Sequence, residues 1–111
     1  EVFMKLYVGG VFQGQEELAR RENPGAALLT DFHKLLREKL AAGEDTLAYA
    51  QRLCAEQPAL VVVSDEVGSG VVPLSREERA WREAVGRALC LLAEHAESVT
   101  RVMCGIGVRL K

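Results

Sequence analysis

Short apolar runs recur along the chain and alternate with segments whose apolar residues have helical spacing. The clearest run, at 59–64, carries no polar alternation, which is typical of a strand that is covered on both faces of a parallel sheet. We therefore predict strands at 4–8, 26–30, 59–64 and 99–104, and a short final strand at 108–110.

Helices are predicted between these runs. They are expected at 15–22, at 31–42, behind Asp45 or Thr46, and at 75–97. Residues 23–25, Asn-Pro-Gly, end the first helix, because proline disfavours the helical conformation of the residue before it. Asp31 stands where a helix cap would, and Ser75 with Glu78 forms a capping-box pattern.

The alternation of strands and helices predicts the architecture. It favours an α/β domain with three layers and a mainly parallel sheet of four to five strands. The length of 111 residues fits a single domain, 1–111. Right-handed crossovers bring the loops that follow parallel strands to one edge of the sheet, where ligands bind. We therefore expect the loops at 9–14 and 65–73 to lie at the same edge.

Composition and charge exclude several classes of function. The chain has 14 basic and 16 acidic residues and few aromatic ones, whereas a nucleic-acid binder presents a basic face and stacking aromatics. No apolar run approaches the roughly 20 residues that span a bilayer. Cys54, Cys90 and Cys104 form no CxxC pair, which argues against a disulfide framework or structural zinc and favours a cytoplasmic protein. Met4 resembles a natural start, which leaves open whether residues 1–3 are native.

The first predicted loop carries a partial phosphate-binding motif. Gly9 and Gly14 have the spacing of a P-loop, GxxxxGK[ST], with Gly10 between them. In a working P-loop the lysine reaches the β- and γ-phosphates and the serine or threonine holds Mg²⁺. Here these positions are Gln15, which has no charge, and Glu16, whose carboxylate can itself occupy the anion site. Taken alone, the loop favours the alternative of a glycine-rich turn without phosphate chemistry.

Acidic residues follow two of the apolar runs. Asp65 and Glu66 resemble the end of a Walker-B strand, which holds Mg²⁺ or polarises water. Asp31 repeats this pattern faintly, but its place at a helix start favours a capping role. His33 and His95 have no cysteine or serine partner at a meaningful spacing, so structural or exposed roles are favoured for both.

Arginines recur along the longest predicted helix. Arg76, Arg79 and Arg82 step by three and drift slowly around one side of it, where they could contact phosphates at the ligand edge. An equally weighted alternative is a solvated face in which arginines pair with Glu78 and Glu83.

The second half of the chain is similar to a known family. It reads VVVSDEVGSGVVP over residues 61–73, then carries the spaced arginines and a GR pair at 86–87, and closes with GIGVRLK at 105–111. This order resembles the C-terminal half of the adenosylcobinamide kinase/adenosylcobinamide-phosphate guanylyltransferase family of cobalamin biosynthesis, with its (T/S)NEVGxGIVP, its arginine-bearing helix and its GIGVKIK-like end. The first loop resembles the family's GGxRSGKS more faintly, and Asp31 falls on an acidic position of the family.

The resemblance implies a P-loop-type domain that is truncated relative to the family. The family phosphorylates adenosylcobinamide with ATP or GTP and then transfers GMP through a histidine. The positions that this chain keeps are Gly9, Gly10 and Gly14 in the phosphate loop, Glu66, Gly68, Gly70 and Pro73 in the second loop, and Arg76, Arg79 and Arg82 in the basic helix. It lacks the loop lysine and serine and the long segment that would carry the guanylyl-accepting histidine, and Asp65 replaces the family's asparagine.

These departures predict a pseudoenzyme without catalytic or metal-binding residues. Such a protein would bind ATP or GTP with Mg²⁺ weakly, or a corrinoid, or serve a regulatory or partner role. Loss of a large segment exposes apolar surface, which favours a homo-oligomer or a partner protein. Two alternatives stay open: an active nucleotide-dependent kinase of corrinoid metabolism, in which Glu66 and the arginines compensate, and a purely structural protein-binding module.

Overall fold

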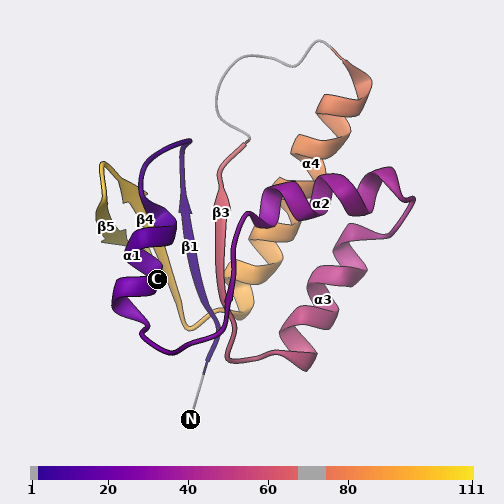
Figure 1. The fold of residues 1–111 in the computed structure, drawn as a ribbon. Coiled ribbons are helices and arrows are strands. Elements are labelled where there is room, and N and C mark those ends of the chain that lie inside the picture. The colour runs from indigo at the N-terminus through magenta and orange to yellow at the C-terminus, as the bar shows by residue number, and fades with distance from the viewer. Residues whose placement is uncertain (1–2, 68–74) are drawn as a thin grey trace.

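A computed structural model describes residues 3–67 and 75–111 of the chain. The elements are, in order, β1 (Lys5–Gly9), α1 (Gln15–Glu22), β2 (Leu28–Leu29), α2 (Phe32–Ala41), α3 (Thr46–Glu56), β3 (Val61–Asp65), α4 (Arg76–His95), β4 (Ser98–Met103) and β5 (Ile106–Arg109). Each predicted strand and helix has a counterpart at its place in this order (Figure 1).

The five strands form one sheet in the order β2-β3-β1-β4-β5. The central strand β1 pairs in parallel with both β3 and β4, and only β5 runs antiparallel to its neighbour. The α/β fold with a mainly parallel sheet is therefore confirmed. The register places Gly9 beside Asp65 on one side and beside Val102 on the other, so these strand ends lie at one edge of the sheet.

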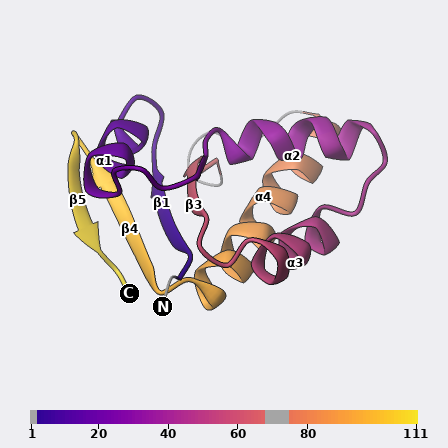
Figure 2. The ribbon, with the colours of Figure 1, turned by 60° about the horizontal axis from the view of Figure 1, so that its bottom comes forward.

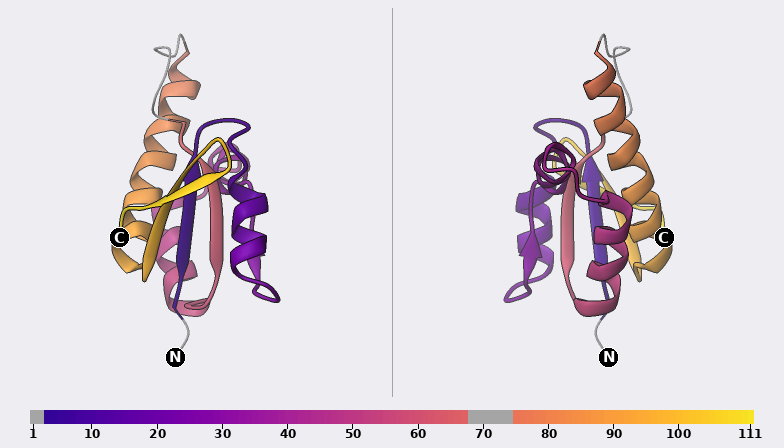
Figure 3. Two further views of the ribbon diagram at one scale, coloured as in Figure 1. Left: turned by 90° about the vertical axis from the view of Figure 1, so that its left-hand side faces the viewer. Right: turned by 90° about the vertical axis from the view of Figure 1, so that its right-hand side faces the viewer.

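Helices cover both faces of the sheet and give it three layers. Leu18 and Ala19 of α1 pack against Tyr7 and Val63 on one face. The helices α2, α3 and α4 pack on the other face, where their apolar side chains meet those of β1 and β3. Figure 3 shows the sheet between α1 and α4, and Figure 2 shows α2, α3 and α4 gathered on the side of β3.

Local signals in the sequence explain where the later helices begin. The Ser75 hydroxyl accepts a hydrogen bond from the backbone N–H of Glu78, at 3.0 Å, as the capping-box pattern predicts. The Asp45 carboxylate accepts one from the backbone N–H of Ala48 in the same way. No helix in the described part of the chain is long and apolar enough to cross a membrane.

Two predicted boundaries are wrong. The second strand was expected at 26–30, yet β2 pairs over Leu28–Leu29 only, because its one neighbour is β3 and the chain turns at once into α2. The final strand was expected at 108–110, and β5 instead spans Ile106–Arg109. The structure turns at Cys104 and Gly105, both with left-handed backbone, and this tight hairpin leaves Ile106 and Gly107 in β5.

Candidate functional site

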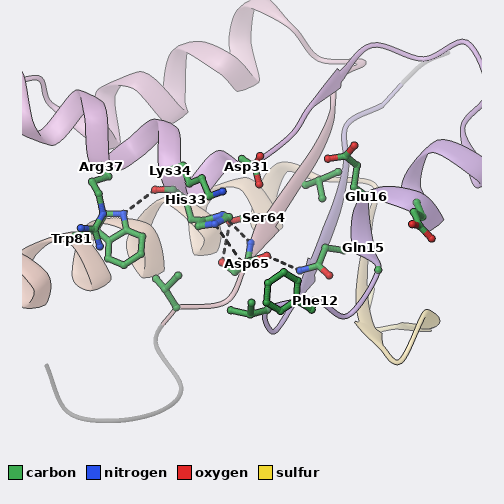
Figure 4. A pocket seen from close by; sticks show the side chains of 15 residues that line it. Phe12, Gln15, Glu16, Asp31, His33, Lys34, Arg37, Ser64, Asp65 and Trp81 are labelled. Atoms are coloured by element: carbon green, nitrogen blue, oxygen red, sulfur yellow. Dashed lines mark hydrogen bonds and ion pairs between the residues drawn. The ribbon is translucent and has the colours of Figure 1, made fainter.

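A cleft of about 890 Å³ opens at the carboxyl ends of β1 and β3. The β1–α1 loop, the start of α2 and the end of β3 supply most of its lining (Figure 4). The backbone N–H of Glu66 donates to the carbonyl of Gly9 at 2.7 Å and so joins the two loops. The expected shared edge is thus confirmed for residues 65–67. The predicted Gly68, Gly70 and Pro73 lie outside the described residues.

The glycines of the first loop have packing roles of their own. A Cβ on Gly9 would lie 2.6 Å from the carbonyl oxygen of Val102, so only glycine lets β1 pass β4 here. Gly14 has a left-handed φ of 87° directly before α1. Gln13 ties the loop to the β4–β5 hairpin, because its side-chain oxygen accepts the backbone N–H of Cys104 at 2.7 Å. The loop therefore has the glycine spacing of a P-loop, and both ends of that spacing, Gly9 and Gly14, have structural reasons to be glycine.

Gln15, at the lysine position of a P-loop, turns back into the protein. Its side chain is buried, and its Nε2 donates to the carbonyl of Gly10 at 3.0 Å and to Oδ1 of Asp65 at 2.8 Å. The next residue, Glu16, is exposed and forms an ion pair with Arg20 one turn along α1, at 3.3 Å. In the structure this carboxylate pairs with Arg20 on the surface of the helix and, within the described residues, makes no capping hydrogen bond at the start of α1.

His33 is a site residue that the sequence analysis missed. It is 5% exposed, and its ring lies against Asp65 at the end of β3. The Nδ1 atom accepts the backbone N–H of Asp65 at 3.1 Å, which assigns the proton to Nε2, and Nε2 lies 3.4 Å from Oδ2 of the same residue. Burial lowers the pKa of His33, and the charges of Asp65 and Asp31 oppose this shift. The imidazole is thus held neutral, with both nitrogens directed at one residue.

The Asp65 carboxylate is therefore the centre of the polar network. Its Oδ1 receives the amide of Gln15 and its Oδ2 faces His33, so one carboxylate links the β1–α1 loop to α2 through the end of β3. Asp65 lies at the carboxyl end of β3, as its place after the apolar run predicts. His33 is the second residue of α2, the helix that follows β2, and β2 is the neighbour of β3, but this place in the chain gives no pattern that pairs the histidine with Asp65.

Asp31 was interpreted as a helix cap, and this interpretation is wrong in part. It occupies the position before α2, but its backbone has a left-handed φ of 52°, and its side chain makes no capping hydrogen bond within the described residues. The chain passes from β2 into α2 across Thr30 and Asp31 only, and aspartate tolerates the left-handed region better than most residues do. Its side chain lines the cleft instead.

The basic groups of the cleft come from α2. Lys34 and Arg37 line it, and the Arg37 guanidinium carbon lies 3.8 Å from the centre of the Trp81 ring. Arg37 also pairs with Glu78 at 3.0 Å, and the Trp81 indole N–H donates to the carbonyl of His33 at 2.8 Å. These contacts fix the beginning of α2 against α4.

The predicted arginines of α4 lie elsewhere. Arg76 and Arg79 are exposed, and Arg82 forms an ion pair with Glu78 at 3.8 Å. None of the three is in the described lining of the cleft. Together with the pairing of Arg87 and Glu83, this arrangement favours the solvated, ion-paired face.

The described residues do not fit a magnesium–nucleotide site. The position that would offer a hydroxyl to Mg²⁺ carries Glu16, which is engaged by Arg20. Both carboxylate oxygens of Asp65 already face donors of Gln15 and His33. In the part of the chain that the structure describes, no group of three histidine, cysteine or acidic side chains is arranged to hold a metal ion.

Known proteins resemble the chain over most of its length. The model of the cobinamide kinase / cobinamide phosphate guanyltransferase family matches residues 15–110. The bifunctional adenosylcobalamin biosynthesis protein CobU of Escherichia coli is 48% identical over 59 residues, which are 52% of this chain and 33% of that protein. The protein of the same name from Salmonella typhimurium is 41% identical over 69 residues, 61% of this chain and 38% of its own length.

This chain therefore spans only about a third of the length of these two relatives. The family match, by contrast, extends from the first residue of α1 to the residue after β5. It includes the starts of both cleft helices and the strand end that carries Asp65. The chain belongs to the cobinamide kinase / cobinamide phosphate guanyltransferase family.

Proposed function

We propose that this chain is a corrinoid-binding member of its family that does not transfer phosphate. The observation that carries the proposal is the position of Gln15. Its amide binds the carbonyl of Gly10 and the carboxylate of Asp65, in the place from which a P-loop lysine reaches the β- and γ-phosphates. With Glu16 next in sequence, the loop offers neither a cation to the transferred group nor a hydroxyl to Mg²⁺.

Charge around the cleft supports the same conclusion. The acidic lining residues are Glu16, Glu17, Asp31 and Asp65, and the basic ones are Lys34 and Arg37. Residues 68–74 contain no ionisable side chain. A charge-assisted hydrogen bond is worth roughly 1.5–3 kcal/mol, so loss of the lysine contact alone weakens nucleotide binding by about one to two decades. We therefore expect ATP and GTP to bind in roughly the high-micromolar range or more weakly.

The ligand class comes from the family and its relatives. The family is named for cobinamide and cobinamide phosphate, and both relatives for adenosylcobalamin biosynthesis. A cleft of about 890 Å³ lies at the upper end of the range of ligand pockets, about 300–1,000 Å³. We propose that the chain acts in the cytoplasm and holds cobinamide there, for storage, delivery or regulation, and that it leaves the chemistry to other proteins.

One assay tests this function. The purified chain is titrated with cobinamide while the corrinoid absorption is followed, and is then incubated with cobinamide, Mg²⁺ and ATP or GTP. We expect a saturable spectral change, no cobinamide phosphate by mass spectrometry, and no GMP adduct in the intact mass of the protein. Cobinamide phosphate above the level of a protein-free control, or a covalent GMP, would contradict the proposal.

An active kinase is the second candidate, and the His33–Asp65 pair favours it. A buried histidine with a lowered pKa beside a carboxylate, in a cleft, is a common arrangement for acid–base chemistry. This candidate predicts turnover in the same assay and its loss in Asp65→Asn. Without turnover in the unmodified chain, the binding function stands alone.

Association with a second protein is the third part of the proposal. Apolar side chains that are about half exposed or more gather on one face of β4, β5 and the residue after it, namely Met103, Ile106, Val108 and Leu110. This face is suited to a homo-oligomer or a partner protein, and a purely structural binding module would use it alone. Light scattering across a concentration series distinguishes a self-associating chain from a monomer.

A further inference from the structure

Phe12 is the most exposed large apolar side chain in the described part of the protein. Its side chain is 98% exposed at the tip of the β1–α1 loop, and it lines the cleft beside Val11 (Figure 4). A phenylalanine on the surface usually folds against its neighbours, because burial of its ring is favourable. Here nearly the whole ring remains available to something that enters the cleft.

The backbone of Phe12 is in a strained conformation, which also indicates a binding role for this residue. Its φ of 59° lies in the left-handed region, which is unfavourable for a bulky side chain. Such strain persists where the surrounding structure imposes it, and it is concentrated at binding sites. The loop around Phe12 is held on both sides, by the Gln13 contacts to the β4–β5 hairpin and by the Gln15 contact to Asp65. The fixed loop therefore presents the ring at the rim of the cleft.

The other large aromatic ring of the cleft has a different role. The Arg37 guanidinium stacks on Trp81, and the indole N–H is bound to the carbonyl of His33. One face of Trp81 is thus already covered by the protein. Phe12 is the aromatic side chain whose face is open to a ligand.

The charges of the cleft restrict what that ligand can be. Four carboxylates line the cleft against two cationic side chains. Glu16 pairs with Arg20 and Arg37 with Glu78, which leaves three carboxylates and one cationic side chain without these ion pairs. A phosphate group would meet net repulsion, whereas a neutral or cationic ligand would not. Amide N–H groups on such a ligand would find acceptors among the carboxylates.

We propose that Phe12 packs against the ring system of the bound ligand, and that the cleft selects a neutral or cationic ring compound without phosphate over its phosphorylated form. The proposal rests on the proposed function for its choice of ligand. It adds a contact between the Phe12 ring and the ligand, and tighter binding of the ligand without phosphate than of its phosphorylated form. The chain then binds cobinamide in preference to cobinamide phosphate, and adenosine in preference to ATP.

Paired titrations test this selectivity. Cobinamide and cobinamide phosphate differ by one phosphate group, as adenosine and ATP differ by three, so each pair isolates the effect of phosphate. We expect cobinamide to bind at least about tenfold more tightly than cobinamide phosphate, a difference of about 1.4 kcal/mol. Equal affinities, or tighter binding of the phosphorylated form, would overturn the proposal.

Variants of Phe12 test whether its ring contacts the bound ligand. Phe12→Ala should lower the affinity for cobinamide about tenfold, in the range of one lost stacking contact. Phe12→Gly should lower it as much while raising Tm, because glycine adopts a φ of 59° without strain. Phe3→Ala is the matched control: it removes the ring of an exposed phenylalanine outside the described cleft lining, and should leave the affinity unchanged. Unchanged affinity in either Phe12 variant would refute the contact between the Phe12 ring and the ligand.

The outcomes separate this inference from the function on which it rests. If cobinamide binds but Phe12→Ala leaves its affinity unchanged, the corrinoid function stands and the proposed contact with Phe12 is wrong. If cobinamide does not bind, while adenosine binds more tightly than ATP and requires Phe12, the ring selectivity survives and the corrinoid function fails. If neither ring compound binds, both are wrong.

Discussion

Two strand-to-helix junctions form opposite walls of the cleft, and they contribute different things to it. The β1–α1 junction has the glycine spacing of a phosphate loop, with Gly14 in the left-handed conformation before the helix. The β2–α2 junction enters its helix through a left-handed residue as well, but there it is Asp31, followed by the buried His33. The first wall has the glycine spacing of a phosphate loop, and each wall directs one side chain at Asp65, Gln15 from the first and His33 from the second.

This difference separates the structural role of the glycines from the contacts of the side chains. Two glycines of the first wall have structural reasons that do not involve phosphate, Gly9 in its contact with Val102 and Gly14 in its left-handed φ. The side chains of that wall have other partners: Gln15 is bound to Asp65, and Glu16 to Arg20. The glycine spacing of this loop therefore indicates how the backbone folds. The side chains at the lysine and serine positions decide whether the loop can bind phosphate.

The largest expected effect tests whether the first wall is structural. Gly9→Ala places a methyl group 2.6 Å from the Val102 carbonyl oxygen and should lower the free energy of unfolding by about 3 kcal/mol. Gly10→Ala is the matched control, because the nearest atom to its Cβ is Gln13 Cγ at 3.7 Å. Urea unfolding of both variants measures the difference. Equal stability of the two would mean that β1 and β4 separate easily.

The second wall has its own test. His33→Ala removes the acceptor of the Asp65 backbone N–H and leaves a partly buried donor without its partner, at a cost of about 2 kcal/mol. His95→Ala, at an exposed position near the end of α4, should change stability little. Thermal unfolding followed by circular dichroism compares them. A Tm of His33→Ala as high as that of His95→Ala would show that the imidazole does not hold Asp65.

A third change attempts to restore phosphate binding to the first wall. Gln15→Lys combined with Glu16→Ser replaces an amide with a cation and removes a carboxylate. If the loop geometry is intact, affinity for Mg·ATP should rise by about tenfold or more, since one charge-assisted contact is worth roughly 1.5–3 kcal/mol. Calorimetry measures the gain, with Gln15→Lys alone as the reference. No gain in the double variant would mean that the glycine backbone alone does not form a phosphate site.

The smallest effect concerns pH. Because burial lowers the pKa of His33 below its ordinary value of 6.5, the unfolded chain binds a proton there before the folded chain does. This contribution to stability is complete above pH 6.5 and is lost as pH falls from there through the folded pKa, with a slope below about 1.4 kcal/mol per pH unit. Urea midpoints of the unmodified protein should fall across this window, and those of His33→Gln should fall less. Parallel curves would remove His33 as the cause.

Much of the fold could be predicted because its signals are local. The bounds of α1 agree with the prediction at both ends, and the caps Asp45 and Ser75 were visible as residue types at helix starts. The two-residue β2 was overestimated, since the length of a strand depends on the pairing of its neighbour and not on its own apolar run.

The site was predicted less completely because its contacts are distant in sequence. Asp65 was recognised from its place after a buried strand, but its bond to His33 joins residues 32 apart, and its bond to Gln15 joins residues 50 apart. A lone histidine carries no pattern from which such a partner can be found. For the arginines of α4 the sequence indicated a role that the structure does not favour. Their regular spacing suggested contacts with phosphates, yet their side chains are outside the described lining of the cleft.

The central claim is that the first wall keeps a phosphate-loop backbone without binding nucleotide tightly. Titration of the unmodified protein with ATP in a calorimeter, with and without Mg²⁺, tests it most directly. The account predicts a Kd of roughly the high-micromolar range or weaker, little changed by Mg²⁺, because Gln15 and Glu16 supply neither charge nor hydroxyl. Tight binding that requires Mg²⁺ would contradict it.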